Sequence, residues 1–468
     1  MEIPEIGAEF EGAALGDERR SRRLMQIARR LGREPSQSLP EAAQSDAELE
    51  GCYRFLNNEQ VAPEAILAPH QRCTVERAAE HGEVLVVHDT TKFRYSDDDS
   101  REGLGPLLAK GGARGFYAHV SLAVTLGAVR DPLGVLAMHS YVRADERVYS
   151  KQAKGLCAPN NEYSRFPLLV QRSEKLLSGR ATAIHVIDRE ADIYELFAQM
   201  REQNHRFVIR LSDDRATTTK REDSRGHLKL SDVVGTLTGV AEREVPLSVR
   251  KGKRLPSERK IHPAREGRIA KLSFRATPVE LRRPDSAEKL LPASLALHLV
   301  HVIEVDPPQG QEPVEWMLLT TEPIQTAEDV LRNVDIYRAR WTIEEFFKAL
   351  KTGCAFEQRQ FRSYDALCRL LAVMLPVAWR LLRIRALARV DPERPGSDLL
   401  TPTQRPSINP GDPAWPGPRR TKFRLPPTPT PAKGESLAAV GLRGEARRAR
   451  RWVRAAGRMK HVSSRVSR

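Results

Sequence analysis

The order of apolar and polar positions divides the chain into regions with different periodicities. Up to about residue 80, apolar side chains recur at helical spacing, and helices are predicted over 18–31 and 46–56. From residue 84 the pattern changes to short continuous apolar runs, which are typical of strands buried on both faces. Predicted strands cover 84–87, 117–126, 133–141, 183–187 and 206–210, with helices over 167–177 and 193–203. This order predicts an α/β fold, a mixed sheet with helices on its faces.

The second half of the chain has other patterns. Between about residues 212 and 320 apolar and polar side chains mostly alternate, which predicts a β-rich insertion with a basic stretch at 250–268. A helix is expected from Thr326 to about Gly353, because Thr326 suits an N-cap and no Gly or Pro intervenes. The apolar run at 367–384 is broken by three arginines and a proline, so it predicts a buried helix and not a membrane span.

Five regions follow from these patterns. After about residue 390 the chain is rich in proline and then in arginine, which predicts a disordered tail. The predicted regions are a helical domain at 1–80, a first part of the α/β core at 81–211, the insertion at 212–322, a second part of the core at 323–390 and the tail at 391–468.

Two aspartates are predicted to lie at the carboxyl ends of buried strands. Asp89 follows the run at 84–87, and Asp188 follows the run at 183–187. In open α/β sheets, sites form at this edge, so both carboxylates could belong to one site. The alternative is that each aspartate only caps a turn, which is the commoner role at the end of a strand.

Four polar residues share one face of the helix predicted after Thr326. At about 100° per residue their directions fall within roughly 60° of one another, and the four are Tyr337, Arg340, Glu344 and Lys351. A carboxylate beside a guanidinium, an ammonium and a phenol would suit a metal ion next to a phosphate backbone. The alternative is an ordinary charged helix face, and Trp341 lies near the same face.

The composition favours a polyanionic partner. The 468 residues include 76 Lys and Arg against 61 Asp and Glu, a formal net charge of +15, and such an excess favours nucleic acid. The helix predicted at 18–31 carries six arginines on its outer face, so residues 1–80 could read a DNA end, although a solvated amphipathic face has the same pattern. The five cysteines form no CxxC pair, which argues against a zinc site. Without a signal-peptide pattern, a cytoplasmic location is expected, with the protein on the nucleoid when it binds DNA.

The three candidate acids suggest one chemistry. Asp89, Asp188 and Glu344 would converge from two strands and a helix and could hold two Mg²⁺ ions, with Mn²⁺ as a substitute. One ion would activate a water or a 3′-hydroxyl, and the other would stabilise the leaving oxygen of an in-line displacement at phosphorus. This hypothesis needs no covalent enzyme intermediate.

The same residues match a known family. Tyr337-x-x-Arg340-x-x-x-Glu344-x-x-x-x-x-x-Lys351 reproduces the YREK signature, so the chain resembles the bacterial DDE insertion-sequence transposases of the IS-four family, most closely the Tn-five type. Other matching segments occur in the same order over about residues 10–385: Ala13-Ala-Leu-Gly-Asp17, Tyr53-Arg-Phe, Asp89-Thr-Thr, Asp188-Arg-Glu-Ala-Asp-Ile, Arg206-Phe-Val-Ile-Arg210 and Asp335-Ile-Tyr.

The resemblance implies a fold, a reaction and roles for individual residues. It implies a ribonuclease-H-like catalytic domain with a β insertion that cuts transposon ends through a DNA hairpin and joins them to target DNA. Asp89, Asp188 and Glu344 would bind the metal ions. The remaining site residues would grip phosphates around a flipped base, stack on it or help to expel it: Tyr337, Arg340, Lys351, Trp316, Trp341 and Arg210. Apart from the resemblance, Trp316 reads equally well as a core aromatic residue.

One segment departs from the family. Members continue into a folded helical segment that forms a homodimer on double-stranded DNA, whereas this chain has the Pro- and Arg-rich tail from residue 391. We therefore expect paired-end synapsis to be impaired. Two alternatives to a cut-and-paste transposase remain open. One is a non-catalytic end-binding protein or repressor left from a decayed transposase, and the other is a general ribonuclease-H-like nuclease that cuts without regard to end sequence.

Overall fold

The chain forms two compact units. A computed structural model describes residues 3–95, 101–107, 113–143, 156, 161–222, 226–249 and 265–391. Among the described residues, the larger unit takes in those up to Thr238, Arg275–His301 and Trp316 to Asp391, and the smaller takes in those of Gly239–Phe274 and Val302–Glu315. The predicted tail beyond Asp391 and most of the predicted basic stretch lie outside the described residues.

The N-terminal part of the larger unit is helical, as predicted. Its helices are α1 (Glu18–Arg33), α2 (Leu39–Ala42), α3 (Asp46–Leu56) and α4 (Pro63–Ala79). Helix α1 begins where the Asp17 carboxylate accepts a hydrogen bond of 2.7 Å from the backbone N–H of Arg19, which satisfies one free donor of the first turn. Some arginines of the predicted outer face are structural, since Arg30 donates to buried Glu48 on α3 at 2.9 Å.

A mixed sheet forms the centre of the larger unit, which confirms the predicted α/β class. Its strands are β1 (Glu83–Tyr95), β2 (Gly105–Pro106), β3 (Arg114–Thr125), β4 (Pro132–Tyr141), β5 (Thr182–Ile187), β6 (Arg206–Arg210), β7 (Ala216–Lys220), β8 (His227–Lys229), β10 (Arg268–Arg282), β11 (Ser294–Val305) and β12 (Glu315–Thr320). Their order is β2-β3-β1-β5-β6-β12-β11-β10-β7-β8, with β4 beside β3. Strands β1, β5 and β6 are parallel, whereas β3 and β12 are antiparallel to their partners.

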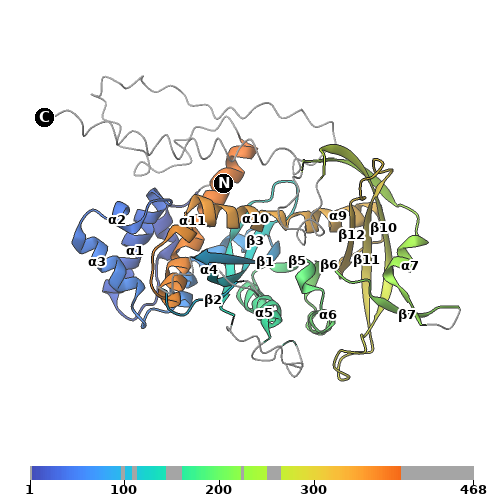
Figure 1. Cartoon of the computed structure of the whole chain (residues 1–468), viewed down its shortest axis with the longest axis horizontal. Coiled ribbons are helices and arrows are strands. Elements are labelled where there is room, and N and C mark those ends of the chain that lie inside the picture. Colours follow the sequence, from blue (N-terminus) through green and yellow to red (C-terminus); the bar gives the residue numbers. More distant parts are fainter. Residues whose placement is uncertain are drawn as a thin grey trace, which may run out of the picture. The chain divides into compact units, whose positions relative to one another are not determined.

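Helices cover both faces of the central strands. Helices α5 (Arg165–Leu177) and α6 (Tyr194–Glu202) lie on one side of β1, β5 and β6, and α9 (Ala327–Arg338) and α10 (Trp341–Lys348) lie on the other (Figure 1). Continuous burial along β5 and β6 explains their apolar sequences, because a strand with helices on both faces has no solvated side. The flanking helices predicted from the sequence are thus confirmed.

The apolar run near the end of the described chain forms a buried helix, as predicted. Helix α11 (Tyr364–Val390) packs beside α1 and α4. Its interrupting arginines contact other elements: Arg369 donates to the carbonyl oxygens of Val61 and Leu56, and Arg383 pairs with Asp131 at 3.4 Å. Among the described residues, no helix has the length and apolarity to cross a bilayer.

Strand β1 is longer than the sequence predicted. It continues to Tyr95, so Asp89 lies within the strand and not at its end. The parallel pairing of β1 with β5 does stop at Val87 and Val186, while the antiparallel pairing with β3 goes on to Tyr95. The prediction that the strand ends near Asp89 was therefore wrong. The polar Thr-Thr-Lys sequence after Asp89 remains strand because it still pairs with β3, although it no longer pairs with β5.

The helix predicted from Thr326 to about Gly353 is interrupted. It divides into α9 and α10, followed by a π-helical turn over Ala349–Gly353. At the junction the N–H groups of Ala339 and Arg340 donate to carbonyls three residues back, which is the tighter 3₁₀ pattern. The prediction of a single helix was therefore wrong. Nothing in the sequence indicated the interruption, because no Gly or Pro lies at this point.

The smaller unit contains a two-stranded antiparallel pair. Strand β9 (Ala241–Leu247) pairs with the first residues of β10, from Arg268 to Phe274. Beside it, Arg268 forms a bidentate ion pair with buried Glu304, with both N–O distances 2.7 Å. Two parallel hydrogen bonds fix the geometry of such a pair more tightly than a single contact would.

A buried polar cluster joins the N-terminus to α4. His70 accepts a hydrogen bond at Nε2 from the backbone N–H of Val135, so its Nδ1–H is the atom that donates to Glu9. Burial raises the pKa of Glu9, but the hydrogen bonds from His70 and Arg77 outweigh it and bring the pKa down to about 2. Burial lowers the pKa of His70. The cluster is therefore built from a neutral imidazole, a carboxylate and a guanidinium.

This cluster should make the fold sensitive to acid. His70 takes up a proton more readily in the unfolded chain, so the free energy of unfolding should fall as the pH drops below roughly 6.5. Glu9 has the lower pKa in the folded state, so a second loss should begin below roughly 4.5 and continue towards 2. Urea unfolding between pH 8 and about 2 measures both. Glu9→Gln should flatten only the acidic limb, and an unfolding free energy that stays constant from pH 7.5 to 4 would contradict the assignment.

Candidate active site

Three carboxylates meet on one guanidinium in the larger unit. The Nη1 of Arg340 lies 3.3 Å from Oδ2 of Asp89 and 3.8 Å from Oδ2 of Asp188. Its Nη2 donates to Oε1 of Glu344, one helical turn further along α10. The structure thus brings together all three acids singled out in the sequence, although they are separated by about 100 and 150 residues along the chain. Their role as metal ligands stays a prediction.

Each acid is placed by a different element. Asp89 lies on β1, two residues beyond its last pair with β5. Asp188 follows the end of β5 and caps a 3₁₀ turn over Arg189–Ala191, with its Oδ1 accepting from the Arg189 N–H at 2.7 Å. Glu344 lies in the first turn of α10, which contacts β1. Strand, turn and helix therefore converge at one edge of the sheet.

The charges at this site do not balance. Three carboxyl groups face one buried guanidinium. Burial lowers the pKa of Arg340, but the neighbouring acids outweigh this effect and raise the pKa above its usual value. Burial raises the pKa of Asp89 to about 7; Arg340 opposes this, and the neighbouring Glu344 and Asp188 add to it. Burial also acts on Asp188, but there Arg340 prevails and the pKa is lowered. A further cation at this position would relieve the excess of negative charge.

The donor set fits a hard divalent cation. Carboxylate oxygens are the ligands that Mg²⁺ takes in proteins. As they stand, the described residues hold no group of three His, Cys, Asp or Glu side chains that is ready to bind a metal. The guanidinium of Arg340 lies between the acids, and its Nε has no hydrogen-bond partner among the described residues. The chemistry of the acids fits a metal, and the position of Arg340 must change for all three to share one.

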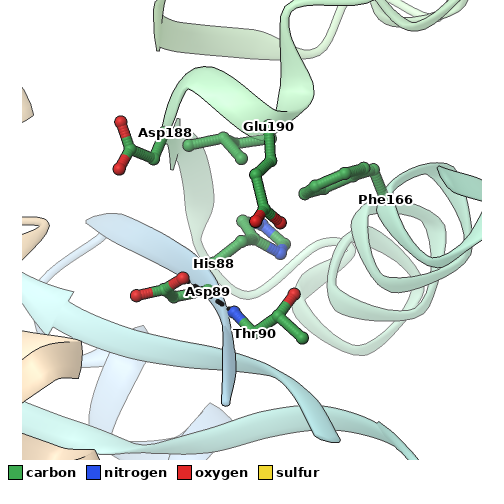
Figure 2. A pocket seen from close by; sticks show the side chains of 7 residues that line it. His88, Asp89, Thr90, Phe166, Asp188 and Glu190 are labelled. Carbon is green, nitrogen blue, oxygen red and sulfur yellow. Dashed lines mark hydrogen bonds between the residues drawn. The ribbon is translucent and has the colours of Figure 1, made fainter. Parts of the chain in front are cut away.

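A small pocket opens beside the two aspartates (Figure 2). It is lined by His88, Asp89, Thr90, Phe166, Ile187, Asp188 and Glu190. Sequence reasoning missed Glu190, which lines this pocket with Asp89 and Asp188. It accepts a hydrogen bond of 2.7 Å from buried Arg165. Its closeness to Asp188 in the sequence could have indicated Glu190 as a site residue. Nothing in the sequence indicated that Arg165 on α5 is its partner.

An aromatic and phenolic cluster supports Asp188. The hydroxyl of buried Tyr337 donates to Oδ1 of Asp188 at 3.0 Å. The ring of Trp316 meets that of Tyr337 edge to face, with centroids 5.7 Å apart, and the guanidinium of Arg210 lies 5.9 Å from the Trp316 ring. Tyr337 therefore contacts the acid directly, and Trp316 and Arg210 lie behind it.

The other two candidates lie differently. Trp341 is 53% exposed, with the Arg340 guanidinium 5.3 Å from its ring. Lys351 follows α10 in the π-helical turn, donates to the carbonyl oxygen of Lys92, and lies 5.4 Å from the ring of Phe93. Burial lowers the pKa of Lys351. Trp341 is thus available to a ligand, and Lys351 is bound to β1 on the strand that carries Asp89.

Removing the Tyr337 hydroxyl should weaken the site. Tyr337→Phe leaves Asp188 with the backbone N–H of Arg189 as a donor but removes the hydroxyl donor. A hydrogen bond to a charged group is worth about 1.5–3 kcal/mol, so the Mg²⁺ concentration for half-maximal DNA nicking should rise roughly tenfold. Tyr194→Phe is the matched control, because this hydroxyl donates to the Pro292 carbonyl at 2.8 Å, away from the acids. Equal Mg²⁺ dependence in the two variants would contradict a role for Tyr337 at Asp188.

The fold and the site define a class. A mixed sheet with helices on both faces and clustered acids at one edge is the architecture of ribonuclease-H-like DDE transposases. Residues 139–375 match the family model described as Transposase DDE domain, and residues 6–61 match the model described as Transposase DNA-binding. The first match covers just over half of the chain. The chain therefore belongs to the DDE transposase family.

The matched ranges bear on the site. The DDE match includes Asp188 and Glu344, whereas Asp89 precedes its first residue. The DNA-binding match covers helices α1 to α3, where the sequence predicted a reader of DNA ends, and it supports DNA as the partner.

Proposed function

We propose that this protein is a metal-dependent cut-and-paste transposase of an insertion sequence, of the IS-four family with the YREK signature. The observation that carries the proposal is the convergence of Asp89, Asp188 and Glu344 on the single guanidinium of Arg340. A chain of the DDE family with its acids so placed is suited to phosphoryl transfer on DNA.

The three acids would hold two Mg²⁺ ions, or Mn²⁺ in their place. When bound, such a pair activates an attacking oxygen and stabilises a leaving oxygen at phosphorus. Tyr337 holds Asp188 by its hydroxyl, and the neighbouring phosphates would attract Arg340. Trp316 offers an aromatic face to a displaced base, with help from the exposed Trp341, and Arg210 and Lys351 add positive charge for the backbone.

The proposed reaction has four displacements at phosphorus. In the first, a water oxygen bonds to phosphorus, the bond to the 3′-oxygen breaks, and this oxygen leaves as a hydroxyl after gaining a proton. In the second, that 3′-hydroxyl attacks the opposite strand and closes a DNA hairpin. After water reopens the hairpin, the 3′-hydroxyl attacks target DNA. Each displacement exchanges one phosphorus–oxygen bond for another, so no oxidant or energy source is needed.

The N-terminal helices would bind the transposon end. Arg30 is used within the module, since it pairs with Glu48. The exposed arginines of α1 are Arg19, Arg22, Arg29 and Arg33. Of these, Arg22 and Arg29 form only long, solvent-exposed ion pairs of 3.7 Å with Glu18 and Glu5, which are weak enough to exchange for DNA phosphates.

A cleavage assay tests the proposal. DNA with the ends of the element should be nicked by the wild-type protein with Mg²⁺ and not by Asp188→Ala. DNA binding without nicking by either protein would favour the end-binding protein or repressor, and nicking without regard to end sequence would favour a general nuclease. Analytical ultracentrifugation with end DNA decides whether two ends are held by a homodimer.

A further inference from the structure

A chain of buried hydrogen bonds crosses the sheet beside the acids. Ser121 on β3 contacts His88 Nδ1 on β1 at 3.0 Å, and His88 Nε2 contacts His185 Nδ1 on β5 at 2.8 Å. His185 Nε2 then contacts Oε1 of Glu174 on α5 at 3.0 Å. Ser121, His88 and His185 are all fully buried. Three neighbouring strands and the helix that covers them are thereby linked through side chains.

The carboxylate at the end of the chain fixes its direction. Glu174 can only accept, so His185 donates from Nε2 and, with one proton on its ring, accepts at Nδ1. His88 then donates from Nε2 and accepts at Nδ1, which leaves Ser121 as the donor to it. In this arrangement every ring nitrogen has a partner.

A second link crosses the pocket next to the first. The side chain of Arg165 is 6% exposed; its Nε donates to Oγ1 of Thr90 at 3.1 Å and its Nη2 donates to Oε2 of Glu190 at 2.7 Å. Thr90 lies on β1, and Glu190 lies in the turn after β5. His88 and Thr90 immediately precede and follow Asp89, and Figure 2 shows them at the pocket with Asp188 and Glu190.

The two links lie at and just beyond the end of the ladder between β1 and β5. The last parallel pair is Val87 with Val186, next to His88 and His185, and β5 ends at Ile187. Beyond that pair, Asp89 and Asp188 continue on separate segments. The Arg165 link joins Thr90 to Glu190 there and supplies a contact at the level of the acids that the β-ladder does not, while the histidine link ties the last paired residues together.

We propose that these links form a brace that sets the separation of Asp89 and Asp188 for metal binding, with Glu174, His185, Thr90 and Arg165 as positioning residues. This inference rests on the proposed function. Unlike Arg340, the brace contacts the neighbours of the acids and leaves their carboxylate oxygens free. Metal sites need ligands held within a fraction of an ångström, and losing such a supporting contact typically costs 10–100-fold in metal affinity.

Mn²⁺ binding by the full-length chain without DNA tests the brace. Electron paramagnetic resonance of free Mn²⁺ gives the dissociation constant, and thermal melting reports folding. Thr90→Val and Glu174→Ala should each weaken Mn²⁺ binding roughly tenfold. Glu174→Gln should restore most of it, because its amide oxygen can still accept from His185. The matched control is Ser173→Ala, which should bind like the wild type. It alters a buried hydroxyl next to Glu174 that has no hydrogen-bond partner among the described residues.

The outcomes separate the brace from the function. If Asp188→Ala abolishes Mn²⁺ binding but Thr90→Val and Glu174→Ala bind like Ser173→Ala, the brace is wrong and the metal site stands. If Asp188→Ala binds Mn²⁺ like the wild type, the proposed metal site itself is wrong. Should Glu174→Ala fail to fold, the nearly isosteric Thr90→Val decides alone: unchanged Mn²⁺ affinity overturns the brace, and a roughly tenfold loss supports it.

Discussion

Glu344→Gln is expected to lower the Mg²⁺-dependent nicking of end DNA by roughly two to three orders of magnitude. The amide keeps the size of the side chain and its place in the first turn of α10, but it removes the negative charge that a metal ion would meet. The loss should appear in the single-turnover rate at saturating DNA, with little change in the dissociation constant for end DNA.

Glu345→Gln is the control for this prediction. Glu345 is the next residue on α10, and it pairs with Arg389 on α11, with both N–O distances 3.0 Å. Its substitution should leave nicking within about threefold of the wild type, since a partly exposed ion pair contributes little. Equal activity of Glu344→Gln and Glu345→Gln would remove Glu344 from the reaction.

Arg340→Ala is expected to change metal binding and catalysis in opposite directions. Without DNA, the guanidinium contacts all three acids and offsets part of their negative charge, so its removal should tighten Mn²⁺ binding by roughly tenfold or more. With DNA, the same arginine would hold a phosphate, so nicking should fall roughly 10²-fold or more. The two changes are opposite because Arg340 contacts the three acids when DNA is absent and would contact a DNA phosphate when DNA is bound.

Arg338→Ala serves as the comparison for Arg340→Ala. Arg338 lies two residues earlier and pairs with Asp335 at 3.2 Å, outside the acid cluster. Its substitution should leave the Mn²⁺ affinity unchanged. Weaker Mn²⁺ binding by Arg340→Ala than by Arg338→Ala, measured by calorimetry without DNA, would show that the arginine supports the acids and does not compete with a cation.

The sequence was most informative where burial on both sides leaves an unmixed apolar pattern. Strand β6 and helix α3 have the bounds that the pattern predicted, because each is enclosed by clear polar boundaries. The extent of β1 and the interruption after α9 were not predictable in this way. The extent of β1 depends on β3, which holds Thr90 to Tyr95 as strand, and the interruption falls at Arg340, whose side chain contacts Asp89 and Asp188.

The candidate site was also predictable only in part from the sequence. Residue type and predicted position suggested Asp89, Asp188 and Glu344, and the resemblance to the family singled them out before any geometry was known. They could not show that Arg340 lies among the acids, since a helix-face argument gives only a direction. Nor could they show that Arg165 holds Glu190 at the pocket, because no local pattern specifies that contact.

The central claim is that Asp89, Asp188 and Glu344 share divalent metal ions. A crystal structure of the protein with end DNA and Mn²⁺, with anomalous scattering recorded for manganese, tests this most directly. The account predicts manganese peaks within about 2.3 Å of oxygen atoms from all three side chains, with the Arg340 guanidinium moved to a DNA phosphate. Anomalous maps without manganese at these acids, and Arg340 still in contact with all three, would contradict it.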